Sequence, residues 1–221
     1  MKQKVWVLAA ALFIISYTAF AQTKLVEKVS KTGSEIVIPY EKYLLPNGLT
    51  LIVHEDHSDP VVHIDVTYHV GSAREEIGKS GFAHFFEHMM FQGSDHVGDD
   101  QHFKIVSSSG GTLNGTTNTD RTNYFQTVPS DALEKMLWAE ADKLGWFINT
   151  VTDPVLAKEK EVVKNEKRQS VDNNPYGHTT YVIDRALYPE DHPYNWQVIG
   201  SLEDLQRATL ADVKEFRNVY P

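Results

Sequence analysis

The sequence contains no cysteine and comparatively little positive charge. Its 221 residues include 21 Lys and Arg against 30 Asp and Glu, which gives a formal net charge of −9. Without thiols the chain forms no disulfide and offers no thiolate to a metal, so histidine and carboxylate groups must bind any metal. The acidic balance argues against a surface for polyanions, so we expect no nucleic-acid partner.

Long apolar runs are also scarce, and the one that stands out lies at the start. Residues 1–21 have the pattern of a secretory signal peptide: Lys2 and Lys4 precede an apolar run that ends in Ala-Phe-Ala at 19–21. A retained membrane anchor is the alternative, but the run is short for a spanning helix. We therefore expect secretion across the inner membrane to the periplasm or the outside, with no stable membrane span after cleavage.

The segment from Gly81 to Met90 carries two histidines in an otherwise apolar stretch, with the sequence His-Phe-Phe-Glu-His at 84–88. In a helix, His84, Glu87 and His88 share one face. Two neutral imidazoles at this spacing can bind one zinc ion, with Glu87 close enough to accept a proton from water.

The alternative for this segment is a buried helix with packed or solvated histidines. Two imidazoles and a carboxylate are costly to bury unpaired, and metal binding would offset that cost. We expect the other histidines of the hairpins, strands and C-terminal loops to have no special role: His54, His57, His63, His69, His178 and His192.

Strand patterns and turn signals predict antiparallel pairs. Pro-Asn-Gly at 46–48 separates two β-rich runs, as in a hairpin. Residues 61–70 alternate between apolar and polar side chains, which predicts a strand with one face toward a core. Two more strands are expected at 112–118 and 121–128, around the turn Thr119-Asp120.

Helices are expected at 99–108, 132–148 and 209–219 and in a segment that opens near residue 152. In the helix at 132–148, Asp131 and Glu134 would form a capping box, and we expect core positions for Trp138, Trp146 and Phe147. The last helix would be capped by Thr209, with Asp212 three residues later.

The helix that opens near residue 152 is rich in charge. Its simplest interpretation is a solvated face with ion pairs between residues four apart. Glu159 and Glu166, however, lie seven residues apart on a side that they share with Val162 and Val163. Solvation explains a carboxylate pair on an otherwise apolar side less easily.

The order His-x-x-Glu-His resembles the inverted zinc motif of the pitrilysin and insulinase type metallopeptidases, which include the mitochondrial processing peptidase. That family takes a third zinc ligand from a distant Glu-rich helix, which carries another functional Glu seven positions earlier. In this sequence Glu166 lies 78 positions after His88, and Glu159 precedes it by seven. The resemblance runs from about residue 41 to the end and includes the segments 78–81, 114–115 and 121–124.

The resemblance implies a zinc-dependent endopeptidase that hydrolyses extended peptides or unfolded polypeptides. One Zn²⁺ per chain would be bound by His84, His88 and Glu166, and zinc lowers the pKa of water at its open position. Glu87 would act as general base and then pass the proton to the departing amine. Glu159 would complete the catalytic set by orienting a ligand or the water.

The strand with Asn114 and Gly115 resembles the edge to which this family adds its substrate as an extra strand. Gly115 leaves the backbone bare in mid-strand, which suits such an addition. A polar surface hairpin is the alternative for this segment. The resemblance thus implies substrate-binding roles for Asn114 and Gly115.

The resemblance further implies an α+β fold, a mainly antiparallel sheet with helices packed on it, as one half of a two-half peptidase unit. Residues 22–40 would be a lead-in segment, and 41–221 the metal-bearing N-terminal domain, truncated before its last strands. A second homologous half-domain or subunit would be needed. We favour a fragment of a longer reading frame over a partner-dependent half, because a half-sheet exposes an unpaired edge. The alternative function is a non-catalytic peptide-binding or structural subunit of a two-chain complex.

Overall fold

The computed structural model describes residues 22–34 and 36–219, and the predicted signal peptide, residues 1–21, lies outside the described residues. The chain divides into two compact units between Asp59 and Pro60. This division lies inside the predicted domain 41–221, whose limits stay a prediction. Within the described part of the chain, no helix combines the length and the apolar character needed to cross a membrane.

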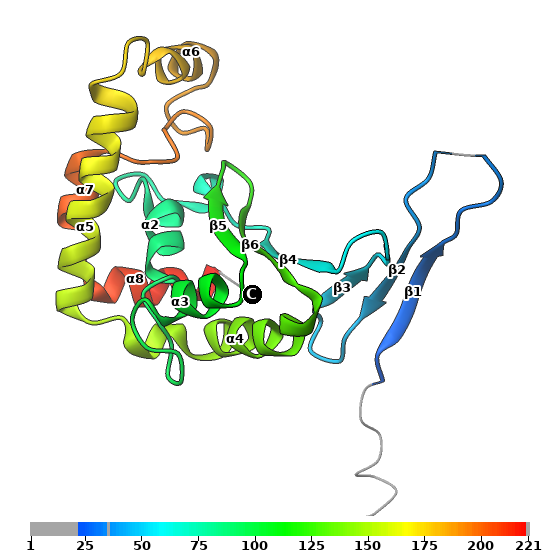
Figure 1. Ribbon diagram of the computed structural model, residues 1–221. Coiled ribbons are helices and arrows are strands. Elements are labelled where there is room, and N and C mark those ends of the chain that lie inside the picture. The colour runs from blue at the N-terminus through cyan, green and yellow to red at the C-terminus, as the bar shows by residue number, and fades with distance from the viewer. Residues whose placement is uncertain (1–21, 35, 220–221) are drawn as a thin grey trace, which may run out of the picture. The chain divides into compact units, whose positions relative to one another are not determined.

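The first unit contains a three-stranded antiparallel sheet in the order β1-β2-β3 (Figure 1), formed by Lys24–Val29, Tyr40–Leu44 and Thr50–Val53. The predicted hairpin around residues 46–48 joins β2 to β3. The segment 22–40, predicted as a lead-in, contains the strand β1. Its charged residues hide any alternation in the sequence, but its backbone pairs with β2 from Lys24 opposite Leu44 to Val29 opposite Tyr40.

The second unit contains a sheet in the order β4-β6-β5, formed by Val61–Tyr68, Thr122–Pro129 and Thr112–Thr117. All pairs are antiparallel. Alternate residues of β6 are buried, so one face of the sheet is covered. In the described part of the chain, β5 pairs on one side only and is an edge strand. The predicted class, antiparallel sheet with packed helices, is confirmed.

The described part of the second unit also contains seven helices: α2 (Phe82–Met89), α3 (Gln101–Ser108), α4 (Leu133–Trp146), α5 (Asp153–Lys167), α6 (Thr179–Leu187), α7 (Leu202–Arg207) and α8 (Leu210–Phe216). Short turns connect them: η1 (Ser72–Arg74), η2 (Ser130–Ala132), η3 (Phe147–Thr150), the π-turn η4 (Arg168–Asp172) and η5 (Arg217–Val219). Helix α2 contacts β5 and β6 as well as α5, and Figure 1 shows it between them.

Two apolar clusters cover the buried face of the sheet. The larger one joins α2 to α5, α7 and α8 through side chains such as Phe85, Phe86, Val163, Leu205 and Phe216. The smaller one joins α3 and α4 to the other end of β6 through Val106, Val128, Ala132 and Met136. Helix α2 is therefore the element at the centre of the main core.

Two predictions for α4 are wrong, the capping box at its start and the core positions of Trp138 and Trp146. The chain enters α4 through the turn η2, and no side chain caps the first turn, so Asp131 and Glu134 form no capping box there. Phe147 is buried as expected, but Trp138 and Trp146 are 51% and 45% exposed. The apolar stripe of α4 that faces the core is narrower than its composition suggested.

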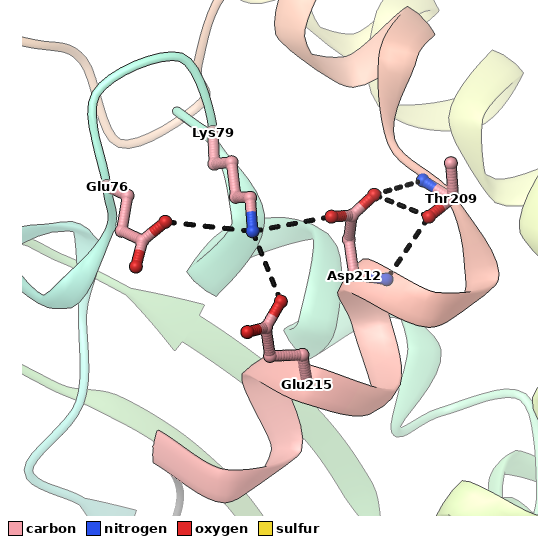
Figure 2. A network of polar contacts seen from close by, with 5 residues as sticks. All are labelled: Glu76, Lys79, Thr209, Asp212 and Glu215. Carbon is pink, nitrogen blue, oxygen red and sulfur yellow. Dashed lines mark hydrogen bonds and ion pairs between the residues drawn. The ribbon is translucent and has the colours of Figure 1, made fainter.

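The start of α8 confirms the other capping prediction. The Thr209 hydroxyl accepts from the Asp212 amide, and the Asp212 carboxylate accepts from the Thr209 amide. Figure 2 shows that Asp212 also faces Lys79, whose Nζ lies 3.3 Å from both Asp212 and Glu215 and 3.7 Å from Glu76. This network ties the segment before α2 to α8, although exposed ion pairs add little stability.

We expect Thr209→Ala to lower the free energy of unfolding by about 1 kcal/mol, because the Asp212 amide loses its acceptor at the helix start. Urea unfolding followed by circular dichroism measures this difference. Thr209→Ser keeps the hydroxyl and should stay close to wild type. Equal stability of the alanine and serine variants would show that the capping box does not stabilise α8.

Candidate metal centre

Three of the predicted residues meet where α2 packs against α5. Nε2 of His88 lies 3.2 Å from Oε2 of Glu166, and Nε2 of His84 lies 3.6 Å from Oε1 of the same carboxylate. The two imidazole rings are 4.8 Å apart and nearly perpendicular. Among the described residues, this is the one group whose donor atoms, all within 4.8 Å of one another, could hold a metal ion.

The donor set fits a zinc ion. Ligand atoms about 2.0–2.2 Å from a tetrahedral zinc are separated from one another by about 3.3–3.6 Å. The distances of 3.2 and 3.6 Å from Glu166 to the two imidazoles match that separation. Two nitrogens and one carboxylate also leave a fourth position for water.

Glu159 stands behind His88 on the same helix as Glu166. Its carboxylate is 3% exposed, and its Oε2 lies 3.5 Å from Nδ1 of His88. The second nitrogen of His88 is thereby held by a buried carboxylate while the first faces Glu166. Such a partner fixes the orientation and tautomer of a metal-binding imidazole.

Glu87 projects from α2 toward the edge strand β5. Its Oε2 accepts a 2.5 Å hydrogen bond from the hydroxyl of Thr117, a contact that the sequence analysis missed. Thr117 lies two residues after Gly115, so both residues point to the same face of β5. This spacing is the signal that could have identified Thr117 once Gly115 was placed beside the helix.

The ionisable groups of the centre change one another's pKa values. Burial, together with the neighbouring imidazole of His88, lowers the pKa of His84 to about 4. Burial also acts to lower the pKa of His88, but hydrogen bonds with Glu159 and Glu166 outweigh it and raise that pKa to about 9. The hydrogen bond from His88 lowers the pKa of Glu166, whereas burial raises the pKa of Glu87. The carboxylates of Glu159 and Glu166 therefore stabilise a positive charge on the imidazole of His88.

These residues open onto a cleft of about 590 Å³ between α2, α5 and β5. Asn114 and Gly115 line the same cleft, and their role in substrate binding stays a prediction. A Cβ atom on Gly115 would lie 2.7 Å from Oε1 of Glu87 and 2.9 Å from the ring of Phe91. The missing side chain leaves room for the Glu87 carboxylate.

The sequence and the fold are similar to those of known proteins. Residues 50–192 match the insulinase family, peptidase family M16. The zinc protease PqqE of Helicobacter pylori is 36% identical over 182 residues, which are 82% of this chain and 40% of that protein. The crystal structure of a protease from Helicobacter pylori has a TM-score of 0.76 at 34% identity, over 82% of this chain and 43% of that one.

The crystal structure of pitrilysin has a TM-score of 0.77 over 90% of this chain and 21% of its own length. Its identity of 21% limits this likeness to the fold. The chain spans about two fifths of the length of the Helicobacter pylori proteins it matches.

The inverted zinc motif, the converging carboxylate and the antiparallel fold agree with a family that contains zinc proteases. The chain belongs to the insulinase family, peptidase family M16.

We expect Glu159→Gln to weaken zinc binding about 10–100-fold, because the amide no longer supplies the negative charge behind His88. Competition with a chromophoric chelator measures the dissociation constant. Glu161→Gln is the matched control, since Glu161 lies on the same helix with a 63% exposed side chain paired to Lys164. Equal affinities of the two variants would contradict a role for Glu159 at the metal centre.

Proposed function

We propose that this chain is the metal-bearing part of a zinc-dependent endopeptidase that hydrolyses extended peptides or unfolded polypeptides. The observation that supports this most directly is the convergence of His84, His88 and Glu166 beside the buried carboxylate of Glu87. All four residues open onto one cleft. A structural ion cluster would need neither the open cleft nor the additional carboxylate.

The chemistry follows from the arrangement of these side chains. His84, His88 and Glu166 would hold the zinc ion, which would supply Lewis acidity and lower the pKa of water beside it. Glu87 accepts the proton as that water attacks the scissile carbonyl, and then delivers it to the departing amine. The raised pKa of buried Glu87 makes its carboxylate a better proton acceptor. Thr117 bonds to Oε2, so Oε1 is left for this exchange.

The substrate is held along β5 in this proposal. An extended peptide that pairs with the edge strand would run past Asn114 and Gly115, directly beside Glu87. Main-chain hydrogen bonds of this kind favour extended or unfolded polypeptides over folded proteins, because a folded protein presents few free strands.

Two further proposals concern the whole protein. The signal-like residues 1–21 support secretion to the periplasm or the outside. The longer relatives and the open edge of β5 support a second homologous half, in the same or another chain, that closes over the cleft. The absence of thiols and the matching donor distances favour one zinc per chain as cofactor.

We expect Glu87→Gln to lower kcat for a quenched fluorescent peptide by about 10²–10⁴-fold while zinc content stays at one per chain. The amide cannot accept the proton, but none of the three zinc donors is changed. The assay uses the full-length protein, with metal measured by mass spectrometry.

Glu76→Gln, an exposed residue of the segment before α2, serves as a control and should keep wild-type turnover. A wild-type protein that binds zinc without any turnover would instead support the non-catalytic peptide-binding function. If the wild-type protein binds no zinc, neither the endopeptidase function nor a zinc-containing peptide-binding subunit would be supported.

We expect Asn114→Ala to raise KM several-fold and leave kcat nearly unchanged, since the change weakens substrate binding along β5 without altering the metal centre. Steady-state kinetics on the same peptide give both constants. Thr112→Ala, two residues earlier on the same strand, provides the comparison. Equal KM values for the two variants would contradict the proposed role of Asn114.

A further inference from the structure

The segment that leads into α2 is held by a buried carboxylate that the sequence analysis did not identify. Glu75 is 7% exposed. Its Oε2 accepts from the amide of Gly81 at 2.9 Å, and its Oε1 accepts from the amide of Ala83 at 2.8 Å. Both amides belong to the start of α2, where helical N–H groups have no partner within the helix. One side chain thus satisfies two of them.

A residue far along the chain holds Glu75 in turn. The indole Nε1 of Trp196 donates to Oε2 of Glu75 at 3.0 Å and lies 3.1 Å from the carbonyl oxygen of Ser72. Burial raises the pKa of Glu75 to about 8, against the opposing effect of these hydrogen bonds.

A second carboxylate holds the residue just before the helix. Oδ2 of Asp204 accepts from the amide of Ser80 at 3.0 Å and from its hydroxyl at 2.6 Å. The amide of Ser201 donates to the same hydroxyl at 3.0 Å. The interactions of Glu75, Ser80, Trp196 and Asp204 are called the α2 clasp below.

The backbones of the two segments also approach closely at the clasp. Gly81 and Gly200 both have positive φ angles, +89° and +75°. A Cβ atom on Gly200 would lie 2.4 Å from the carbonyl oxygen of Ser80. The contact therefore requires glycine at 200, and it fixes the position at which α2 begins.

The position of His84 makes the start of α2 important. The helix has eight residues, and a helix of this length is not stable by itself in water. His84 lies in the first turn and His88 in the second. Fraying of the first turn would move His84 away from Glu166 while His88 stays in place. The metal centre would then lose one of its three donors.

We propose that the α2 clasp is a positioning device for the metal centre, so that Glu75 and Asp204 raise zinc affinity without binding the metal. The inference rests on the proposed function, because it takes His84, His88 and Glu166 as the zinc ligands. The hydrogen bonds of the clasp go to the chain ahead of the ligands. They reduce the conformational freedom that the ligands lose when the metal binds.

The test measures the zinc dissociation constant of the full 221-residue chain by chelator competition, at a temperature where every variant is folded. Glu75→Gln replaces one of two acceptor oxygens by a donor, and Asp204→Asn does the same next to Ser80. Each should weaken zinc binding at least tenfold with the stoichiometry unchanged at one. Hydrogen exchange should become faster at the amide of Ala83 in the metal-free protein.

Trp196→Phe is the milder variant, in case the charge changes prevent folding. It keeps a six-membered aromatic ring and removes the N–H donor together with the five-membered ring, but it changes no charge, so we expect a smaller loss of affinity in the same direction. Val128→Ala is the control for stability, because Val128 is buried in the smaller cluster away from the clasp. It should lower the unfolding temperature and leave the zinc affinity unchanged.

The outcomes separate the two proposals. Wild-type affinity in Glu75→Gln and Asp204→Asn, or an equal loss in Val128→Ala at the same loss of stability, would overturn the positioning role alone. A wild-type chain that binds no zinc would overturn the proposed function, and the inference with it.

Discussion

The structure depends on the packing of α2 against α5. Neither helix contains a complete set of donors, since His84 and His88 lie on one and Glu166 on the other. Apolar contacts bring the helices together, with Phe85 and Phe86 of α2 in the same cluster as Val163 of α5. The same cluster contains residues of the sheet and of α7 and α8. The geometry of the candidate metal centre is therefore set by the main core and not by local sequence.

This packing buries His84, Glu87 and Glu159 almost completely and leaves Glu166 41% exposed to the cleft. A buried polar group is costly unless it finds a partner. Two sets of partners are present. Thr117 bonds to Glu87, and His88 lies between Glu159 and Glu166. The two carboxylates around His88 stabilise a positive charge, which raises the pKa of the imidazole to about 9. In the proposed function a metal cation takes over that charge, so the same carboxylates serve the metal-free and the metal-bound protein.

Most features that depend on neighbouring residues could be predicted from the sequence. Among the distant contacts, only the meeting of Glu166 with His84 and His88 was expected, and that expectation came from the family resemblance. The shared face of His84, Glu87 and His88, the alternation along β4 and the capping box at Thr209 all follow from spacings of a few residues. The family resemblance indicated Glu159 as a residue that orients a ligand or the water, but its contact with Nδ1 of His88 is visible only in the structure.

Strand β1 was missed because charged residues obscure its alternation, and its stability comes from pairing with β2. The capping box expected at α4 does not form, because the chain turns into the helix through η2. The α2 clasp joins Glu75 to Trp196 and Ser80 to Asp204, across more than 120 residues. No sequence periodicity relates residues this far apart, so these contacts could be identified only from the folded structure.

Strand β5 links the proposed chemistry to substrate binding. Alternate residues of a strand point to the same face, so Gly115 and Thr117 both face α2. Gly115 leaves space for the Glu87 carboxylate, and Thr117 bonds to it. In the proposed function, a peptide would pair with the edge of this strand that has no partner among the described residues. A peptide that pairs with β5 is therefore placed relative to Glu87 by the strand that also holds Glu87. The same strand would thus position both the bound peptide and Glu87. The position of the scissile bond relative to Glu87 would then follow from the register in which the peptide pairs with β5.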